Sequence, residues 1–189
     1  MLKFEEVLKG CLNNEMKSKE MIYKSFYGYL IAVILRYVRH REEAEELVND
    51  TFIKVFKSIH QFVPPADKLV LEKGFKAWTS KIASRTAIDF LRGKKLLLSI
   101  EDVAPEEEPY TTVNIISDLN VKDILKLLEE LPEIQRLIFN LYEIEGFSHQ
   151  EISKILNIPE SSSRVYLVRA KQKLRMSYAK TLTHFYETN

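Results

Sequence analysis

Hydrophobic side chains recur at helical spacing along most of the chain, and this pattern predicts an all-α protein. Over residues 14–38, large apolar and aromatic residues crowd one broad face, as in a helix that packs in a core. A second helix is predicted over residues 42–59, where glutamates fill the first turn and complement the helix dipole. A third runs from Phe75 to Leu91, with Trp78 expected in the core. Valine and isoleucine favour strands, but here they occur at helical spacing among helix-forming residues. The sequence therefore gives little support for β-strands.

Two segments interrupt the helical pattern. Residues 61–74 include two adjacent prolines and a glycine, so a loop is predicted there, with room for one helical turn. Residues 96–118 have no sustained period and contain three successive glutamates and two prolines, which predicts a flexible acidic linker. Helices are expected again over 121–130 and 133–145. We therefore expect two small helical domains joined by a linker.

Residues 133–175 have the pattern of a helix-turn-helix. Ser148 and Glu151 show the spacing of a capping box, which predicts a helix start. A short turn that ends in a proline separates this helix from a second one near Glu160, for which the serines at 161–163 offer caps. On the second helix, leucine and alanine spaced by three and four face inward. The opposite face is small and polar at its start and basic further on, which suits a helix that meets base edges first and phosphates later.

Charge is distributed unevenly, although the formal net charge is only +1. Residues 72–95 and 160–180 each carry a net charge of +5, whereas residues 101–130 carry −7. For nucleic-acid binding, the distribution of charge matters more than its sum. Two basic segments on either side of an acidic one therefore favour a DNA-binding protein.

The composition, 46% hydrophobic and 29% charged residues, is that of a folded protein. The single cysteine, Cys11, can form neither an internal disulfide nor a zinc site, so we expect a buried thiol in a reducing compartment. Residues 1–10 lack the features of a signal peptide, and the longest apolar stretch, residues 27–35, is too short to span a bilayer. The sequence has no phosphate loop, nucleophile elbow or metal-ligand cluster. We expect a cytoplasmic protein that is not an enzyme and needs no metal or cofactor.

Three stretches of the chain resemble the extracytoplasmic-function group of bacterial sigma-70 factors. Residues 44–52, Ala-Glu-Glu-Leu-Val-Asn-Asp-Thr-Phe, are similar to the family's A-E-D-L-V-Q-E-V-F pattern. Residues 75–92 are close to F-R-x-W-L-x-x-I-A-R-N-x-A-I-D-x-L-R. The third stretch begins at 131–132 and includes residues 146–159 and 169–175. Each motif alone is weak, whereas three in the right order and spacing, over nearly the whole chain, are specific.

The resemblance implies a role for each part of the chain. Residues 1–95 would dock on core RNA polymerase and recognise and melt the minus-10 region, 96–118 would be a tether, and 119–189 would read the minus-35 duplex. The first motif would make or support the contact with core polymerase through Glu45, Glu46, Leu47, Asn49, Asp50 and Phe52. The loop 61–74 would capture a flipped base, and the basic helix after it would contact the minus-10 backbone through Lys76, Lys81, Arg85, Arg92, Lys94 and Lys95.

The helix-turn-helix would supply the minus-35 contacts. The base-edge candidates are Ser161, Ser162, Val165, Tyr166 and Arg169. The phosphate candidates are Arg136, Ser148, Arg164 and Lys173. Ser84-Arg85, Ser163 at a valine-like position of the second helix, and the long loop 61–74 depart from the family pattern, which bears on the promoter sequence rather than on the class of function.

The partners implied are core RNA polymerase and promoter DNA, and the resemblance leaves room for an anti-sigma factor, with no membrane insertion. The alternative is a two-domain helix-turn-helix regulator that binds duplex DNA without core polymerase. Strong binding to promoter DNA by the free chain would favour this alternative.

Overall fold

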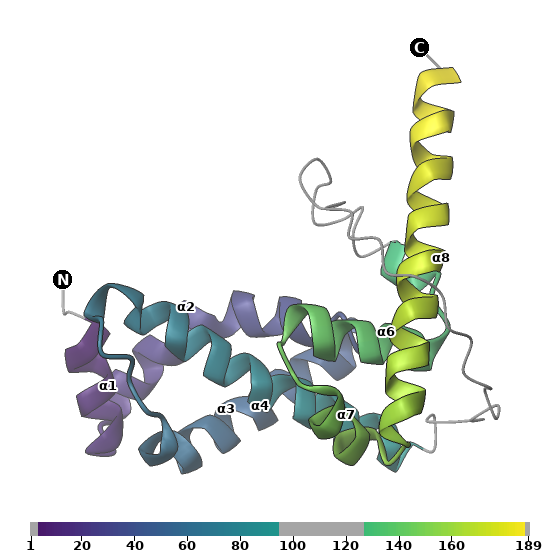
Figure 1. Ribbon diagram of the computed structural model, residues 1–189. Coiled ribbons are helices and arrows are strands. Elements are labelled where there is room, and N and C mark those ends of the chain that lie inside the picture. Colours follow the sequence, from purple (N-terminus) through teal and green to yellow (C-terminus); the bar gives the residue numbers. More distant parts are fainter. Residues whose placement is uncertain (1–3, 95–126, 188–189) are drawn as a thin grey trace. The chain divides into compact units, whose positions relative to one another are not determined.

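The computed structural model describes residues 4–94 and 127–187, and within these ranges every regular element is a helix (Figure 1). The chain divides into two compact units, residues 1–93 and 94–189. The predicted all-α class with two small helical domains is therefore confirmed. The linker boundaries stay predictions, because residues 96–118 lie outside the described ranges. No helix in the described part of the chain combines the length and apolarity needed to cross a membrane.

The first unit is built from helices that pack in pairs. Its described α-helices are α1 (Phe4–Leu12), α2 (Met16–Ile34), α3 (Arg41–Ser58) and α4 (Leu71–Gly93). Two short turns, η1 (Ile59–Gln61) and η2 (Lys68–Val70), lie in the connection between α3 and α4. Each of α2, α3 and α4 packs against the other two, and α1 packs on α2 (Figure 1). These contacts make α4 one wall of the core.

The helix α4 starts earlier than predicted. The predicted helices over 14–38 and 42–59 correspond to α2 and α3, but α4 begins at Leu71 instead of Phe75, so the expected loop is shorter. Leu71 and Phe75 are both buried, one turn apart on the same helix face. Their burial offsets the low helix propensity of Gly74, which the sequence pattern had placed in the loop.

The helix α1 lies in a segment for which the hydrophobic pattern predicted no element. Its buried side chains include Val7, Leu8 and Cys11. At the corner between α1 and α2, a Cβ on Gly10 would overlap the side chain of Ser18, so glycine is needed there. The buried thiol predicted for Cys11 is confirmed, since it is 3% exposed and burial raises its pKa to about 11.

Aromatic rings fill the centre of the first unit. Phe75 from α4 is fully buried, and its ring centroid lies 5.1 Å from that of Phe26 on α2 and 5.5 Å from that of Phe4 on α1. Phe62, just after η1, and Trp78, on the next turn of α4, complete the cluster at 5.3 and 5.7 Å. Trp78 therefore packs against the cluster, but it is half-buried instead of lying in the core as predicted. The cluster joins α1, α2, α4 and the start of the α3–α4 connection.

The second unit contains the helix-turn-helix. Its labelled elements are α6 (Glu133–Phe139), η3 (Asn140–Ile144), α7 (His149–Leu156) and α8 (Glu160–Glu187). The helix predicted over 133–145 is thus α6 continued by η3, a wider π-helical turn. Of the helix predicted over 121–130, only residues 127–130 are described: 127–129 are helical and 130 is a turn. Both α6 and α7 pack against α8.

The ends of α7 follow the sequence prediction. The Ser148 hydroxyl accepts a hydrogen bond from the Glu151 N–H at 3.3 Å, and Glu151 Oε2 accepts one from the Ser148 N–H at 2.9 Å. The predicted capping box is therefore confirmed. Gly146 before α7 and Asn157 after it have positive φ angles of 71° and 54°, which glycine and asparagine tolerate best.

The start of α8 near Glu160 is confirmed, but the predicted capping by the serines is wrong. The helix begins at Glu160, so the serines at 161–163 lie inside its first turn and do not cap it. The Pro159 carbonyl accepts a hydrogen bond from the Ser163 N–H at 3.2 Å, which starts the helical ladder before the serines. Proline suits this position because its φ angle is already helical.

Replacement of Phe75 by alanine should destabilise the first unit by about 3 to 5 kcal/mol, because it removes the ring at the centre of the aromatic cluster. Trp78 is the only tryptophan of the chain and lies in this unit, so urea unfolding followed by its fluorescence is a direct measurement. Val63→Ala, at a side chain that is 83% exposed, is the control and should change the free energy of unfolding little. Equal effects of the two substitutions would contradict the central role of Phe75.

Candidate nucleic-acid interface and docking surface

One face of α3 is acidic and contains a large exposed apolar side chain. We call it the α3 face and define it by exposed residues at spacings of three and four: Glu42, Glu46, Asn49, Asp50 and Ile53. Ile53 is 52% exposed at the C-terminal end of this face. An exposed apolar side chain beside acidic groups is a pattern of protein-docking surfaces, in which the apolar residue is the anchor and the charges select the partner.

Of the residues predicted to contact core polymerase, some are exposed on the α3 face and others are buried beneath it. Glu46, Asn49 and Asp50 lie on the α3 face, whereas Leu47 and Phe52 are buried at 4% and 3% exposure. The two buried residues can therefore support the face but not contact a partner. Asn49 is oriented by the Tyr23 hydroxyl on α2, which donates a hydrogen bond to Asn49 Oδ1 at 3.0 Å. Glu45 is half-buried at the edge and forms an ion pair with Arg41 at 2.9 Å.

The sequence prediction missed Ile53. The sequence contained the information needed to find it. A helix turns by about 100° per residue, so the buried positions of α3 place residue 53 on the exposed side of the helix. An isolated exposed isoleucine needs no special explanation by itself. Its importance appears only when the fold places it among the three polar residues that the sequence motif had singled out.

The basic side chains of α4 do not form a single surface. Lys81, Arg85 and Arg92 are spaced by four and seven residues and share one face, where they are wholly or partly exposed. Lys76 is nine residues from Arg85 and therefore lies on the other side of the helix. There its Nζ is 6.0 Å from the ring centroids of Phe26 and Tyr29, in cation–π contact.

Two further predicted minus-10 residues, Lys94 and Lys95, follow α4 in the sequence. Lys94 is exposed just after the helix, and Lys95 lies outside the described residues. The described basic surface of α4 is therefore the strip of Lys81, Arg85 and Arg92, extended by Lys94, and we call it the α4 strip.

The α3–α4 connection presents apolar side chains to solvent. Val63 is 83% exposed and Leu69 is 93% exposed. The base of this connection is fixed, because Phe62 packs on Phe75, and its far end is ordered by the Asp67 carboxylate, which accepts the Leu69 N–H at 2.9 Å. Exposed apolar side chains on an anchored loop can stack against an unpaired base. The sequence prediction named the loop but not these two residues.

The outer face of α8 is polar at its start and basic further on, as predicted. Ser161 is exposed and Ser162 partly exposed, and the side chain of Arg164 is 57% exposed although it pairs with Glu160 at 2.5 Å. Exposed ion pairs one turn apart are weak, so a phosphate can replace Glu160 as the partner of Arg164. The face continues through partly exposed residues spaced by four: Val165, Arg169 and Lys173.

The inner face of α8 is also as predicted. Leu167 and Ala170 are buried at 6% and 0% exposure. Ala170 forms a cluster with Leu128 and Leu131, and Leu174 packs against this cluster. The inner face therefore attaches α8 to the residues that follow the predicted linker.

Two residues that were predicted to contact DNA are buried in the second unit. Tyr166 and Arg136 are each only 5% exposed, so neither side chain is presented to DNA. Tyr166 is one turn before the buried Ala170 and thus belongs to the inner face, which is broader than the leucine and alanine spacing indicated. Ser148 is exposed, but its hydroxyl is engaged in the capping box.

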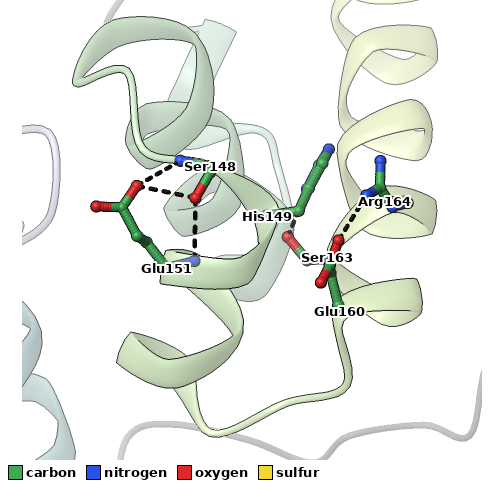
Figure 2. A network of polar contacts seen from close by, with 6 residues as sticks. All are labelled: Ser148, His149, Glu151, Glu160, Ser163 and Arg164. Atoms are coloured by element: carbon green, nitrogen blue, oxygen red, sulfur yellow. Dashed lines mark hydrogen bonds and ion pairs between the residues drawn. The ribbon is translucent and has the colours of Figure 1, made fainter.

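A buried polar contact joins the two helices of the helix-turn-helix (Figure 2). His149 Nδ1 lies 2.9 Å from Ser163 Oγ, and the Tyr142 ring stacks on the imidazole with centroids 4.4 Å apart. Burial and then the charge of Arg164 lower the pKa of His149 from its ordinary value of 6.5. Among more distant charges, Lys171 acts in the same direction, whereas Glu160 and Glu143 oppose it. In the described residues, no group of three or more histidine, cysteine or acidic side chains could hold a metal ion.

Comparisons with known proteins agree with this geometry. The sigma-70 region 2 family matches residues 22–96, and the sigma-70 region 4 family matches residues 122–174, together about two thirds of the chain. The ECF RNA polymerase sigma factor SigM of Bacillus subtilis is 24% identical over 159 residues, which cover 83% of this chain and 93% of that protein. The RNA polymerase sigma factor SigZ of the same bacterium is 29% identical over 139 residues, which cover 74% and 77%.

A solved structure shares the fold. It is the sigma factor RpoE of Bartonella quintana in complex with the anti-sigma factor NepR, with a TM-score of 0.50 and 21% identity, and it covers 87% of this chain and 98% of that chain. The chain belongs to the sigma-70 family of RNA polymerase sigma factors, in the extracytoplasmic-function group.

The buried His149 should make stability depend on pH. The unfolded chain takes up a proton on His149 near pH 6.5, whereas the folded chain keeps the imidazole neutral to lower pH. The stability that neutral His149 contributes is therefore complete above pH 6.5 and is lost as the pH falls from there through the folded-state pKa. We expect His149→Gln to lose less stability over this interval than the wild type, measured by circular dichroism during thermal unfolding.

The exposed His60 provides the control for this prediction. His60→Gln should keep the pH dependence of the wild type. Identical pH profiles for His149→Gln and the wild type would contradict the assignment to His149.

Proposed function

We propose that this chain binds core RNA polymerase and directs promoter-specific initiation through three surfaces. The α3 face docks on the polymerase, the α4 strip with the α3–α4 connection engages the opened minus-10 region, and the outer face of α8 reads the minus-35 duplex. The observation that carries the proposal is the presence, in one chain, of a helix-turn-helix and a separate acidic face with an apolar anchor. A sigma factor needs both, because it must hold DNA and polymerase at once.

The chemistry of the α3 face supports the docking role. The exposed carboxylates of Glu46 and Asp50 favour a basic partner surface, and the side chain of Ile53 would be desolvated when that surface covers it. Apolar burial then supplies affinity, while the surrounding charges select the partner and its orientation.

The first unit also has the elements that strand opening requires. An unpaired base loses its stacking energy, and apolar side chains such as Val63 and Leu69 can recover part of it. The α4 strip can follow the phosphates of the exposed strand, and each phosphate contact releases condensed counterions. Minus-10 engagement should therefore weaken as salt rises.

The order of small and basic residues along α8 supports the minus-35 role. Ser161 and Ser162 are small enough for the start of the helix to approach base edges in the major groove. Arg169, two turns further on, can form two hydrogen bonds with a guanine, and Arg164 can reach a phosphate.

The alternative, a helix-turn-helix regulator that acts without polymerase, is not favoured. It accounts for α7 and α8 but gives no role to the α3 face, and the first unit matches sigma-70 region 2. Our proposal assigns no catalytic step to this chain, because nucleotide joining belongs to the polymerase, and it places the chain in the cytoplasm with the polymerase. The structure of the Bartonella quintana sigma factor was solved in complex with an anti-sigma factor. We therefore include an anti-sigma factor among the proposed partners of this chain.

The decisive experiment is run-off transcription with core polymerase purified from the organism that encodes this chain. Genomic fragments are transcribed with and without the full chain, and the transcripts are sequenced. We expect transcripts with defined start sites only when the chain is present. Tight and selective binding of the same fragments without polymerase, together with no new transcripts, would instead favour the regulator.

Substitutions on the α3 face should weaken holoenzyme assembly. Ile53→Ala and Asp50→Lys are each expected to lower the affinity for core polymerase, by about 1 to 3 kcal/mol if Ile53 is a central anchor and Asp50 pairs with a basic group. Fluorescence anisotropy of the labelled chain measures this affinity. The control is Glu20→Lys, at an exposed position of α2 outside this face. Unchanged affinity of both α3 variants would remove the face from the docking surface.

Arg169→Ala should weaken promoter binding by the holoenzyme by about 1 to 3 kcal/mol and relax the preference at one minus-35 position. The physical reason is the loss of a paired hydrogen bond to a base edge. Arg164→Ala, as a phosphate contact, should instead weaken binding to all sequences similarly and reduce its salt dependence. If Arg169→Ala changes neither the affinity for promoter DNA nor the preference at any minus-35 position, Arg169 does not contact a base.

A further inference from the structure

A polar pair lies where the two helices of the helix-turn-helix meet. His149 is the first residue of α7, and Ser163 lies in the first turn of α8. The imidazole Nδ1 and the serine Oγ are 2.9 Å apart, with the two residues 9% and 0% exposed. Among the described side chains of these two helices, the other buried ones are Ile152, Leu156, Tyr166, Leu167 and Ala170. Contacts among such side chains tolerate some sliding and rotation, whereas a hydrogen bond requires a particular distance and angle.

The imidazole is held from a second side. Tyr142, in the π-helical turn η3, stacks on the His149 ring with an angle of 24° between the planes. The chain before α7 and the first turn of α8 therefore both fix the ring. Because the ring cannot easily turn, its Nδ1 defines one point in space that Ser163 must meet.

We propose that His149 and Ser163 are positioning residues for minus-35 reading: their hydrogen bond fixes the rotation of α8 against α7 and thereby selects the α8 side chains that meet base edges. This inference rests on the proposed function of α8. Ser162 and Arg164 are the chain neighbours of Ser163, so any rotation at this point moves both directly. A helix with its side chains is about 10 Å across, so a rotation of about 20° moves an outer side-chain tip by roughly 2 Å. Hydrogen bonds to base edges do not survive such a displacement.

The pair also gives a reason for a departure in the sequence. Ser163 occupies a position that is valine-like in the pattern this chain resembles. With valine at 163, the buried Nδ1 of His149 would face a methyl group and lose its partner, which is costly for a buried polar atom. The serine is therefore matched to the histidine fourteen residues earlier in the chain.

The test uses two variants of the same shape. Threonine and valine differ only by a hydroxyl in place of a methyl group, so Ser163→Thr and Ser163→Val have the same packing, and only the first retains a hydrogen-bonding group. Core polymerase with each full-length variant transcribes a promoter library with a random minus-35 element and a constant minus-10 element, and sequencing gives the enrichment of the preferred minus-35 sequence. We expect Ser163→Thr to resemble the wild type and Ser163→Val to lower the enrichment about two- to tenfold, the range expected for loss of one buried hydrogen bond.

The same pair of variants in a His149→Phe background tests whether the hydroxyl acts through the histidine. We expect the difference between threonine and valine to disappear there, as in a double-mutant cycle for two coupled residues. The control is the same threonine and valine pair at Ser80, a buried serine of α4 whose hydroxyl donates to the Ala77 carbonyl at 3.1 Å. Those two variants should have equal minus-35 enrichment.

Three results would overturn the inference. Equal enrichment for Ser163→Thr and Ser163→Val would show that the hydroxyl does not affect reading. An undiminished difference in the His149→Phe background would assign the effect to another partner. A lower melting temperature of Ser163→Val with unchanged enrichment would reduce the pair to a structural contact. Absence of any promoter-specific transcript with the wild-type chain would instead overturn the proposed function, and this inference with it.

Discussion

Burial of one face of α4 stabilises the first unit, and burial of one face of α8 stabilises the second, so that the opposite face of each helix stays exposed. In the first unit, Phe75 connects α4 to three other parts of the chain through ring contacts. In the second unit, Leu167 and Ala170 attach α8 to the core. Because these inner faces are packed, the outer side chains of both helices have defined directions.

The surfaces differ in how firmly their side chains are held. On the α3 face, Asn49 is oriented by the hydroxyl of Tyr23, and Ile53 is carried on a helix whose inner side is fully packed. On α8, Arg164 is paired only with Glu160 across one exposed turn. Exposed pairs of this kind contribute a few tenths of a kcal/mol, so they are readily exchanged for phosphate. In the proposed function, a rigid docking face and exchangeable DNA contacts suit a protein that stays on polymerase while the DNA changes shape.

A buried hydrogen bond in the second unit restricts the orientations in which its helices can pack. The hydrogen bond between His149 and Ser163 lies between helices whose remaining buried side chains are mostly apolar. Such a bond contributes modestly to stability, but it excludes orientations that apolar contacts would allow. It also ties the stability of this unit to pH, because the same burial that makes the bond directional disfavours the charged imidazole.

The sequence by itself determined the all-α class, the helices α2, α3 and α7, the capping box at Ser148 and the two faces of α8. These follow from local rules, namely the spacing of apolar residues and the hydrogen bonds of a helix terminus, which involve neighbours in the chain. Only the tertiary structure decided that α4 begins at Leu71, that Tyr166 is buried and that His149 meets Ser163. Each of these depends on contacts between segments far apart in the sequence, and the strength of those contacts, not local propensity, sets where a helix begins and which of its side chains reach solvent.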